Sequence, residues 1–126
     1  MKRILIIDDA ATVRLYHRQI LEPLGFEVIE AATGFEGMEK LFSQDVDLLL
    51  VDVNMPKMDG YTFLKLLRRD EQGINGIPAI FISTEVELKD AKAAYLVGAN
   101  MYLTKPVHPA TLALYAKLLT GEGGEE

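Results

Sequence analysis

Five short runs of apolar residues, each followed by a stretch of helical periodicity, constrain the fold more than any other feature of this sequence. The runs lack the polar alternation of a half-exposed strand, so they are typical of strands buried on both faces. The predicted strands span residues 4–7, 26–30, 48–51, 79–82 and 101–103, and the predicted helices span 11–24, 33–44, 60–70, 85–97 and 109–121. Strands that alternate with helices in this way predict an α/β fold, in which helices cover both faces of a parallel sheet.

Residues at the ends and along the faces of the predicted helices support this assignment. Thr33 and Glu36 have the spacing of a capping box, Asp59 is the predicted N-cap of helix 60–70, and Pro109 opens the last helix. Apolar residues at helical spacing are expected to face the core: Val13, Tyr16, Ile20 and Leu24 in the first helix, Phe35, Met38, Leu41 and Phe42 in the second, and Phe63, Leu64 and Leu67 in the third. Three arginines are expected on solvated helix faces: Arg14, Arg68 and Arg69.

Length and composition fit one domain. The chain has 126 residues, of which 49% are hydrophobic, and this is enough to form a single core. We expect the domain to span residues 1–120. Residues 121–126 read GEGGEE, and because they carry no apolar side chain they are predicted to form a flexible acidic tail.

The charge balance and the absence of cysteine exclude several classes of function. The net charge is −6, and an acidic chain without a basic patch binds nucleic acid and anionic membranes poorly. The lack of cysteine excludes a disulfide scaffold, a thiol nucleophile and a cysteine-ligated zinc site. The amino-terminal apolar run is stopped by two acids and is too short for a secretory or membrane-spanning segment. We therefore expect a cytoplasmic protein without nucleic-acid or membrane partners.

Polar side chains gather where the predicted strands end. The strands are followed by Asp8 and Asp9, by Asp52, by Ser83 and Thr84, and by Lys105. In open parallel sheets, ligands bind beyond the carboxyl ends of the strands. Each of these residues alone is most simply a turn, cap or surface residue. The conjunction of three carboxylates, a hydroxyl and a lysine at one edge of the sheet indicates a functional site.

The charges of this group indicate what the site binds. Carboxylates crowded into a small volume repel one another unless cations lie among them, and a divalent ion together with Lys105 would cancel the charges of Asp8, Asp9 and Asp52. Carboxylate oxygens favour Mg²⁺, which proteins commonly hold through one or two carboxylates and phosphate oxygens. The sequence therefore predicts a phosphate-handling Mg²⁺ site. Asp8 and Asp9 would be metal ligands, and Asp52, the single acid of the central strand, would be the nucleophile that forms an aspartyl phosphate.

Four segments of the chain match a known family. They are residues 6–9 (IIDD), 51–60 (VDVNMPKMDG), 77–83 (IPAIFIS) and 98–106 (GANMYLTKP). Together they resemble the receiver domains of two-component response regulators, particularly the single-domain chemotaxis type, and the resemblance covers residues 2–119. It implies a flavodoxin-like, doubly wound sheet with strand order 2-1-3-4-5.

The resemblance implies a role for the acids of the site. Asp52 would accept a phosphoryl group from a phosphohistidine on a sensor histidine kinase or a phosphotransfer protein. Asp9, Asp52 and the backbone carbonyl of Asn54 would bind Mg²⁺, and Asp8 would act largely through water. The Lys105–Pro106 peptide bond is expected to be cis.

The resemblance also implies a switch. Lys105 and Ser83 would bond to the phosphoryl oxygens, Ser83 would draw its loop inward, and Tyr102 would turn from outside to inside. The output would be a changed surface for an unknown downstream protein, formed by helix 85–97, strand 101–103 and helix 109–121. Such a domain is a signalling protein that catalyses only its own phosphorylation and dephosphorylation.

Three positions depart from the family pattern. Thr84 stands where the family usually has Ala or Gly, so its larger side chain could slow phosphate loss or obstruct the switch tyrosine. Val107 replaces a commoner Phe and His108 replaces the usual polar cap of the last helix, and we interpret both as packing variation. The hydroxyl role is assigned to Ser83, and not to Thr84, by its spacing from Pro78.

Three alternatives remain open. A Mg²⁺-dependent phosphohydrolase could also form an aspartyl phosphate, but such enzymes commonly carry Asp-x-Asp at the nucleophile, and residues 52–54 (DVN) lack the second acid. A degenerate interaction module is disfavoured because the set of acids, hydroxyl and lysine is intact. Within the receiver class, the sequence does not distinguish an output switch from a phosphate sink or relay receiver without direct output.

Overall fold

Five parallel strands form one sheet in the order β2-β1-β3-β4-β5 in the computed structural model, which describes residues 1–121. They are β1 (Arg3–Ile7), β2 (Glu27–Ala31), β3 (Leu48–Asp52), β4 (Ala79–Ser83) and β5 (Met101–Thr104). The α/β class and the flavodoxin-like order 2-1-3-4-5 are thereby confirmed. The predicted tail lies, apart from Gly121, outside the described residues.

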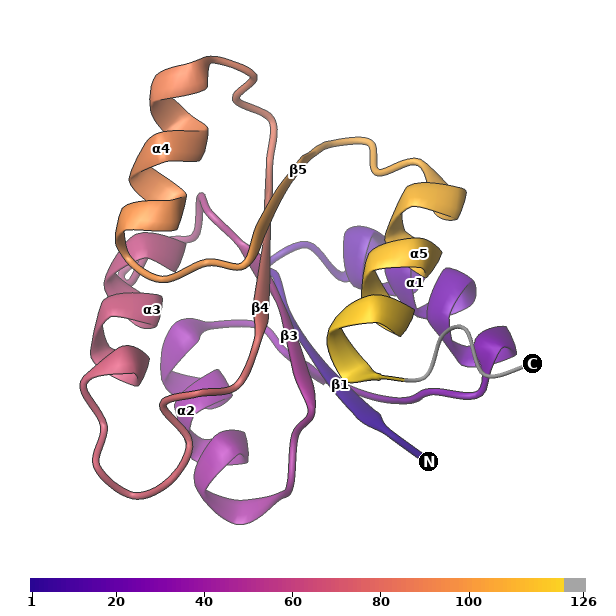
Figure 1. Ribbon diagram of the computed structural model, residues 1–126, viewed down its shortest axis with the longest axis horizontal. Helices are drawn as coiled ribbons and strands as arrows, with labels where there is room; N and C mark the ends of the chain where they lie inside the picture. Colours follow the sequence, from indigo (N-terminus) through magenta and orange to yellow (C-terminus); the bar gives the residue numbers. More distant parts are fainter. Residues whose placement is uncertain (122–126) are drawn as a thin grey trace.

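Two layers of helices cover the sheet. The helices are α1 (Ala11–Leu21), α2 (Gly34–Ser43), α3 (Gly60–Arg68), α4 (Leu88–Leu96) and α5 (Pro109–Thr120). Figure 1 shows α2, α3 and α4 on one face of the sheet and α1 and α5 on the other. The first helix is shorter than predicted because the chain continues as a 3-10 turn, η1 (Glu22–Leu24), whose Pro23 has no N–H to donate to an α-helix.

Each strand serves two cores. Along β3, Leu49 and Val51 belong to the core beneath α2, α3 and α4, whereas Leu48 and Leu50 belong to the core beneath α1 and α5. Successive side chains of a strand point to opposite faces, so a sheet that is covered on both faces needs an apolar residue at every position. This explains the unbroken apolar runs of the sequence.

The inward face of α1 differs from the prediction. Its buried residues are His17 and Leu21, whereas Tyr16 and Leu24 are exposed. The Tyr16 hydroxyl donates to the carbonyl oxygen of Val107 at 2.7 Å. A tyrosine at the rim of a helix can pack its ring while its hydroxyl stays at a polar edge, and apolar spacing alone does not distinguish this position from the core.

The inward face of α2 also differs, because glycines occupy it. A Cβ atom at Gly37 would lie 2.6 Å from Cδ1 of Ile7, so the helix approaches the sheet too closely for a side chain at that position. Leu41 is buried as predicted, but Phe35 and Phe42 are more than half exposed. The inward residues of α3, by contrast, are the predicted ones: Phe63, Leu64 and Leu67.

The predicted helix caps are present. The Thr33 hydroxyl accepts a hydrogen bond from the N–H of Glu36 at 3.0 Å at the start of α2. The carboxylate of Asp59 accepts one from the N–H of Thr62 at 2.8 Å at the start of α3. Helix α3 therefore begins at a fixed point directly after the loop that follows β3.

Candidate functional site

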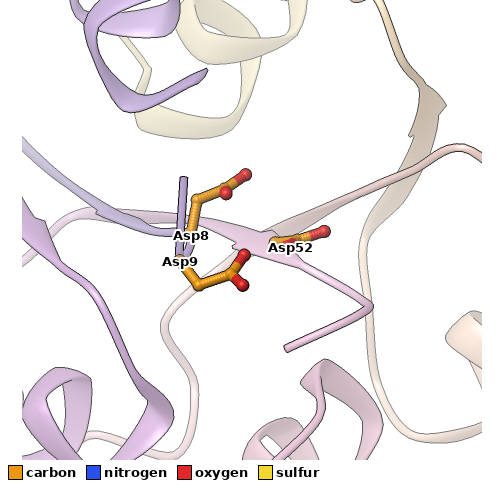
Figure 2. Close-up of side chains that lie close together, drawn as sticks. All are labelled: Asp8, Asp9 and Asp52. Atoms are coloured by element: carbon orange, nitrogen blue, oxygen red, sulfur yellow. The ribbon is translucent and has the colours of Figure 1, made fainter. Parts of the chain in front are cut away.

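The candidate site lies where β1 and β3 end side by side. The two strands are paired, with Ile7 opposite Val51, so the residues that follow them reach the same edge of the sheet. Figure 2 shows the resulting group of acids, Asp8 and Asp9 from the end of β1 and Asp52 from the end of β3. Carboxylate oxygens of all three lie within 4.8 Å of one another.

Lys105 joins this group from the end of β5. Its Nζ atom lies 3.2 Å from Oδ1 of Asp52 and 3.3 Å from Oδ2 of Asp8. The backbone N–H of Lys105 donates to the carbonyl oxygen of Ser83 at 2.7 Å, and this bond fixes the backbone of Lys105 to the end of β4. The Lys105–Pro106 bond is cis, as predicted. One ammonium group thus bridges two of the three carboxylates.

The surroundings of Asp52 disfavour its charged form. The residue is only 4% exposed, and its burial together with the charge of Asp8 raises its pKa to about 6, although Lys105 acts in the opposite direction. Burial alone would lower the pKa of Lys105, but Asp52 and Asp8 raise it above its ordinary value. The lysine is therefore charged at neutral pH, and the acids still exceed it in number.

This donor set fits a hard metal ion. All three side chains offer carboxylate oxygens, the ligands that Mg²⁺ and Ca²⁺ prefer, and a cation among them would relieve the repulsion that raises the pKa of Asp52. Asn54 lies beside the group, and its N–H donates to Oδ1 of Asp52 at 3.3 Å. The described residues thus form an acidic pocket able to hold a metal ion.

The hydroxyl residues predicted for the site differ in burial. Ser83 is fully buried, and it follows Ile82, which lies opposite Asp52 in the sheet. Its Oγ atom accepts a hydrogen bond from the N–H of Glu85 at 3.0 Å. Thr84 is exposed. The structure therefore brings Ser83, not Thr84, to the buried end of β4.

Tyr102 contacts the same loop from β5. Its hydroxyl donates to the carbonyl oxygen of Glu85 at 2.8 Å, and its side chain is partly buried. Glu85 is therefore held through its N–H by Ser83 and through its carbonyl by Tyr102. Two of the three predicted switch residues, Ser83 and Tyr102, thus meet at one residue of the β4–α4 loop, and no such bond is found for the third, Thr84, among the described residues.

A cavity of about 430 Å³ opens beside the lysine of the site. Thr84 and Lys105 line one part of it, and residues of α1, including His17, line another. His17 is buried, and burial lowers its pKa below the ordinary value. Sequence patterns did not mark His17 as a neighbour of the site, because its helix face was assigned to other residues.

Two arginines that were predicted to be solvated are bound to the backbone instead. Arg14 donates through Nη1 to the carbonyl oxygen of Asp8 at 2.6 Å. Arg68 donates through Nη2 to the carbonyl oxygen of Gly98 at 2.8 Å. A guanidinium group has five donors in a fixed fork, so it can satisfy loop carbonyls that no helix or strand pairs. Arg69 is exposed, as predicted.

Among the described residues, no helix has both the length and the apolar character that crossing a membrane requires. The cytoplasmic location expected from the sequence remains a prediction.

Comparison with known proteins agrees with this fold and identifies the family. The model of the response regulator receiver domain family matches residues 4–117. Chemotaxis protein CheY1 of Helicobacter pylori is 36% identical over 121 residues, which cover 94% of this chain and 97% of that protein. Sensor histidine kinase CheAY of the same species is 41% identical over 105 residues, but this chain spans only 13% of its length.

A solved structure is also closely similar. Chemotaxis protein CheY4 of Vibrio cholerae superposes with a TM-score of 0.87 at 32% identity, over 94% of this chain and 98% of that one. The family match, the strand order and the relatives of matching length all agree, and we conclude that the chain belongs to the response regulator receiver domains, the signalling modules of two-component systems.

Proposed function

We propose that this receiver domain is a phosphorylation-activated switch in which Asp52 carries the phosphoryl group. The observation that carries the proposal is the contact of one lysine, Lys105, with both Asp52 and Asp8 inside a three-carboxylate pocket. An ammonium group in this position can neutralise the charge of an incoming phosphoryl group while it keeps its contacts with the two carboxylates. Asp52 is the acceptor because it is the acid of the central strand, and its carboxylate is fixed by Lys105 and by the N–H of Asn54.

The transfer would exchange one bond to phosphorus for another. A carboxylate oxygen of Asp52 forms the new O–P bond, the P–N bond of a phosphohistidine breaks, and its electron pair returns to the imidazole nitrogen of the donor. Asp52 must be ionised for this step, and with a pKa of about 6 it is mostly ionised above neutral pH. The donor would be a sensor histidine kinase or a phosphotransfer protein, the partners that the family implies.

Mg²⁺ fits the oxygen donors of the pocket. The ligands would be the carboxylates of Asp9 and Asp52 and the backbone carbonyl of Asn54, with Asp8 acting largely through water. When bound, the ion would supply charge neutralisation to the phosphoryl oxygens. The surplus of acids over Lys105 supports this assignment, because a metal-free pocket leaves like charges facing one another.

The switch would begin at Ser83. A hydrogen bond from its hydroxyl to the phosphoryl group would compete with the bond that Ser83 now accepts from Glu85, and would draw the β4–α4 loop toward the site. Tyr102, on β5, also bonds to Glu85. A shift of the loop would therefore change the environment of Tyr102 and let its side chain turn inward. The α4-β5-α5 face would then present a different surface to a downstream protein.

The closing experiment for this proposal uses acetyl phosphate as the donor. With MgCl₂ present, intact mass should show a single phosphoryl adduct on the native chain and none on Asp52→Asn. Asp59→Asn, which changes an exposed acid in the same loop, should still be labelled. Labelling of Asp52→Asn at an equal level would refute Asp52 as the acceptor. Repeated turnover of a small phosphate ester with substrate saturation would favour a phosphohydrolase instead, because a switch catalyses only its own phosphorylation and dephosphorylation.

The two hydroxyl residues can be separated by phosphate lifetime. Thr84 lines the cavity beside Lys105, so we expect it to restrict the approach of water to the phosphoryl group. Thr84→Ala should therefore shorten the lifetime of the phosphorylated form while leaving its switch intact. Ser83→Ala should weaken the effect that phosphorylation of Asp52 has on the β4–α4 loop. If Thr84→Ala weakened this effect of phosphorylation more than Ser83→Ala, the hydroxyl role would belong to Thr84 and not to Ser83.

A further inference from the structure

A charged bridge connects the end of β2 to the loop that carries two of the site's acids. Arg14, on α1, lies between the two segments. Its Nε atom is 2.7 Å from Oε1 of Glu30, and its Nη1 donates to the carbonyl oxygen of Asp8 at 2.6 Å. One guanidinium group thus holds the side chain of a β2 residue and the main chain of the β1–α1 loop at the same time.

Glu30 is itself fixed, so it can orient the arginine. Its second carboxylate oxygen is paired with Arg18, and its backbone carbonyl accepts a hydrogen bond from Nζ of Lys40 at 2.8 Å. Burial alone would raise the pKa of Glu30, but the bonds from Arg14 and Arg18 lower it below its ordinary value. Glu30 is therefore ionised at neutral pH, and its position does not depend on Arg14 alone.

The Arg14 contact adds a restraint where the loop has few others. Asp8 is held at its N–H by the carbonyl of Ala31 at 3.1 Å, and its Oδ1 accepts from the N–H of Ala10 at 2.9 Å. The carbonyl oxygen of Asp8 is bonded by Arg14. Without that bond, the peptide plane between Asp8 and Asp9 could rotate, and the two carboxylates would no longer be held in one fixed relation.

Electrostatics explains why an acid accompanies this arginine. A lone guanidinium group near a cation site would repel the cation, and Glu30 offsets its charge. The arginine can then donate to the Asp8 carbonyl without opposing metal binding. Outer contacts of this kind orient metal ligands, and removing them typically costs about 10–100-fold in metal affinity.

We propose that Arg14, oriented by Glu30, is a positioning residue that fixes the Asp8–Asp9 loop for Mg²⁺. The inference rests on the proposed function, because it requires that these acids bind the ion. It gives a role to β2, the strand that contributes no side chain to the predicted site: Glu30, near the end of β2, lies opposite Ile6 of β1.

The test is the Mg²⁺ dissociation constant, measured by isothermal titration of the full chain with MgCl₂. Arg14→Ala should raise the constant about 10-fold, and Glu30→Gln, which keeps the shape of the side chain, should raise it as well. Arg14→Lys keeps the charge but lacks the planar fork that reaches Glu30 and the Asp8 carbonyl in the fixed geometry of a guanidinium group, so its constant should be intermediate. Glu30→Gln also serves as the readout if Arg14→Ala does not fold.

Arg3 provides the matched control. It pairs with Glu27 of β2 at 3.2 Å, at the opposite end of the same two strands, and its side chain is 26% exposed against 17% for Arg14. Arg3→Ala should lower the unfolding temperature about as much as Arg14→Ala and leave the Mg²⁺ constant unchanged. Equal constants in the native chain and Arg14→Ala, or equal increases in both variants, would overturn the inference and leave the proposed function standing. Failure of the native chain to bind Mg²⁺ would overturn both.

Discussion

Helices α3 and α4 lie side by side on one face of the sheet, yet they are attached to it very differently (Figure 1). Helix α3 buries Phe63, Leu64 and Leu67 completely, and its first turn is capped by the Asp59 side chain. Helix α4 buries only Ala94 among its residues, and its start has no side-chain cap. Two equally short helices therefore differ in their buried apolar residues and in their capping.

The ends of the two helices show the same contrast. A Cβ atom at Gly60, the first residue of α3, would lie 2.7 Å from the carbonyl oxygen of Asp52, so α3 begins in direct contact with the proposed phosphoacceptor. Helix α4 instead leaves Leu88 and Leu96 70% and 87% exposed. Side chains of α3 bond to the backbone of α4 and of the turn after it: Tyr61 donates to the carbonyl oxygen of Asp90, and Arg68 donates to that of Gly98.

The difference between α3 and α4 fits two different roles in the proposed switch. A phosphoacceptor needs a fixed position, and α3 gives Asp52 a rigid support. A switch element must change its arrangement at low cost, and elements with little buried apolar surface open locally at low free energy. Because α4 follows the Ser83 loop, phosphorylation in the proposed switch would act on the less firmly packed of the two helices.

The strongest test makes the same substitution in both helices. Leu67→Ala removes a fully buried side chain from α3 and should lower the free energy of unfolding by about 2–5 kcal/mol. Leu96→Ala removes an exposed side chain from α4 and should change it by less than about 0.5 kcal/mol. Urea unfolding followed by circular dichroism measures both. Similar losses would mean that α4 is as firmly packed as α3.

The pH dependence of stability tests how the fold holds Asp52 beside α3. Asp52 has a folded-state pKa of about 6 against an ordinary value of 3.8, so at pH 7 its ionised form destabilises the metal-free folded state by up to about 3 kcal/mol. Asp52→Asn should therefore be more stable than the native chain at pH 7. Its advantage should shrink as the pH falls through 6 and disappear only below 3.8, where Asp52 is protonated in both states.

Thermal unfolding at a series of pH values, without divalent ions, measures this difference. Asp45→Asn, at an exposed position, is the control and should show no such trend. An Asp52→Asn protein that is less stable than the native chain at pH 7 would contradict the inference that the ionised form of Asp52 destabilises the folded state.

The link between the two helices is testable at Arg68. Its guanidinium group, on α3, donates to the carbonyl oxygens of Gly98 after α4 and of Ile77 before β4. Arg68→Ala leaves these partly buried carbonyls unpaired, at a cost of about 1–3 kcal/mol. Hydrogen exchange should accelerate at residues 94–100. Arg69→Ala, at the exposed neighbour, should change neither quantity, and equal effects of the two variants would show that Arg68 is no tether.

The same contrast explains what the sequence could predict of the fold. Strands and the inward face of α3 were predictable because both depend on the spacing of large apolar residues. The inward face of α2 was not, because Gly37 allows a close approach that hydropathy does not register, and Phe35 is left outside. The low burial of α4 was equally hidden, since the exposed Leu96 has the same hydropathy as a core leucine.

For the site, the acids could be predicted and their supports could not. Asp8 and Asp52 had to meet, because parallel strands that are neighbours end at one edge of the sheet. Arg14 and Arg68 bind main-chain carbonyls outside their own helices, and a carbonyl group has no residue-type signature. Glu30 offered the one available signal, an acid at the end of a strand beside β1 that needed a cationic partner.

The smallest expected effect concerns the hold of Tyr102 on the loop before α4. Tyr102→Phe removes the hydroxyl that donates to the Glu85 carbonyl, at a cost of about 0.5–1.5 kcal/mol. The loss should be local, so hydrogen exchange should accelerate over residues 85–90 and stay unchanged in α3. Tyr95→Phe is the matched control, because its hydroxyl contacts only the sulfur of Met101 at 3.9 Å. If exchange in α3 accelerated together with that of the loop, the two helices would open as one unit. The support of Asp52 would then not be separate from the proposed switch element.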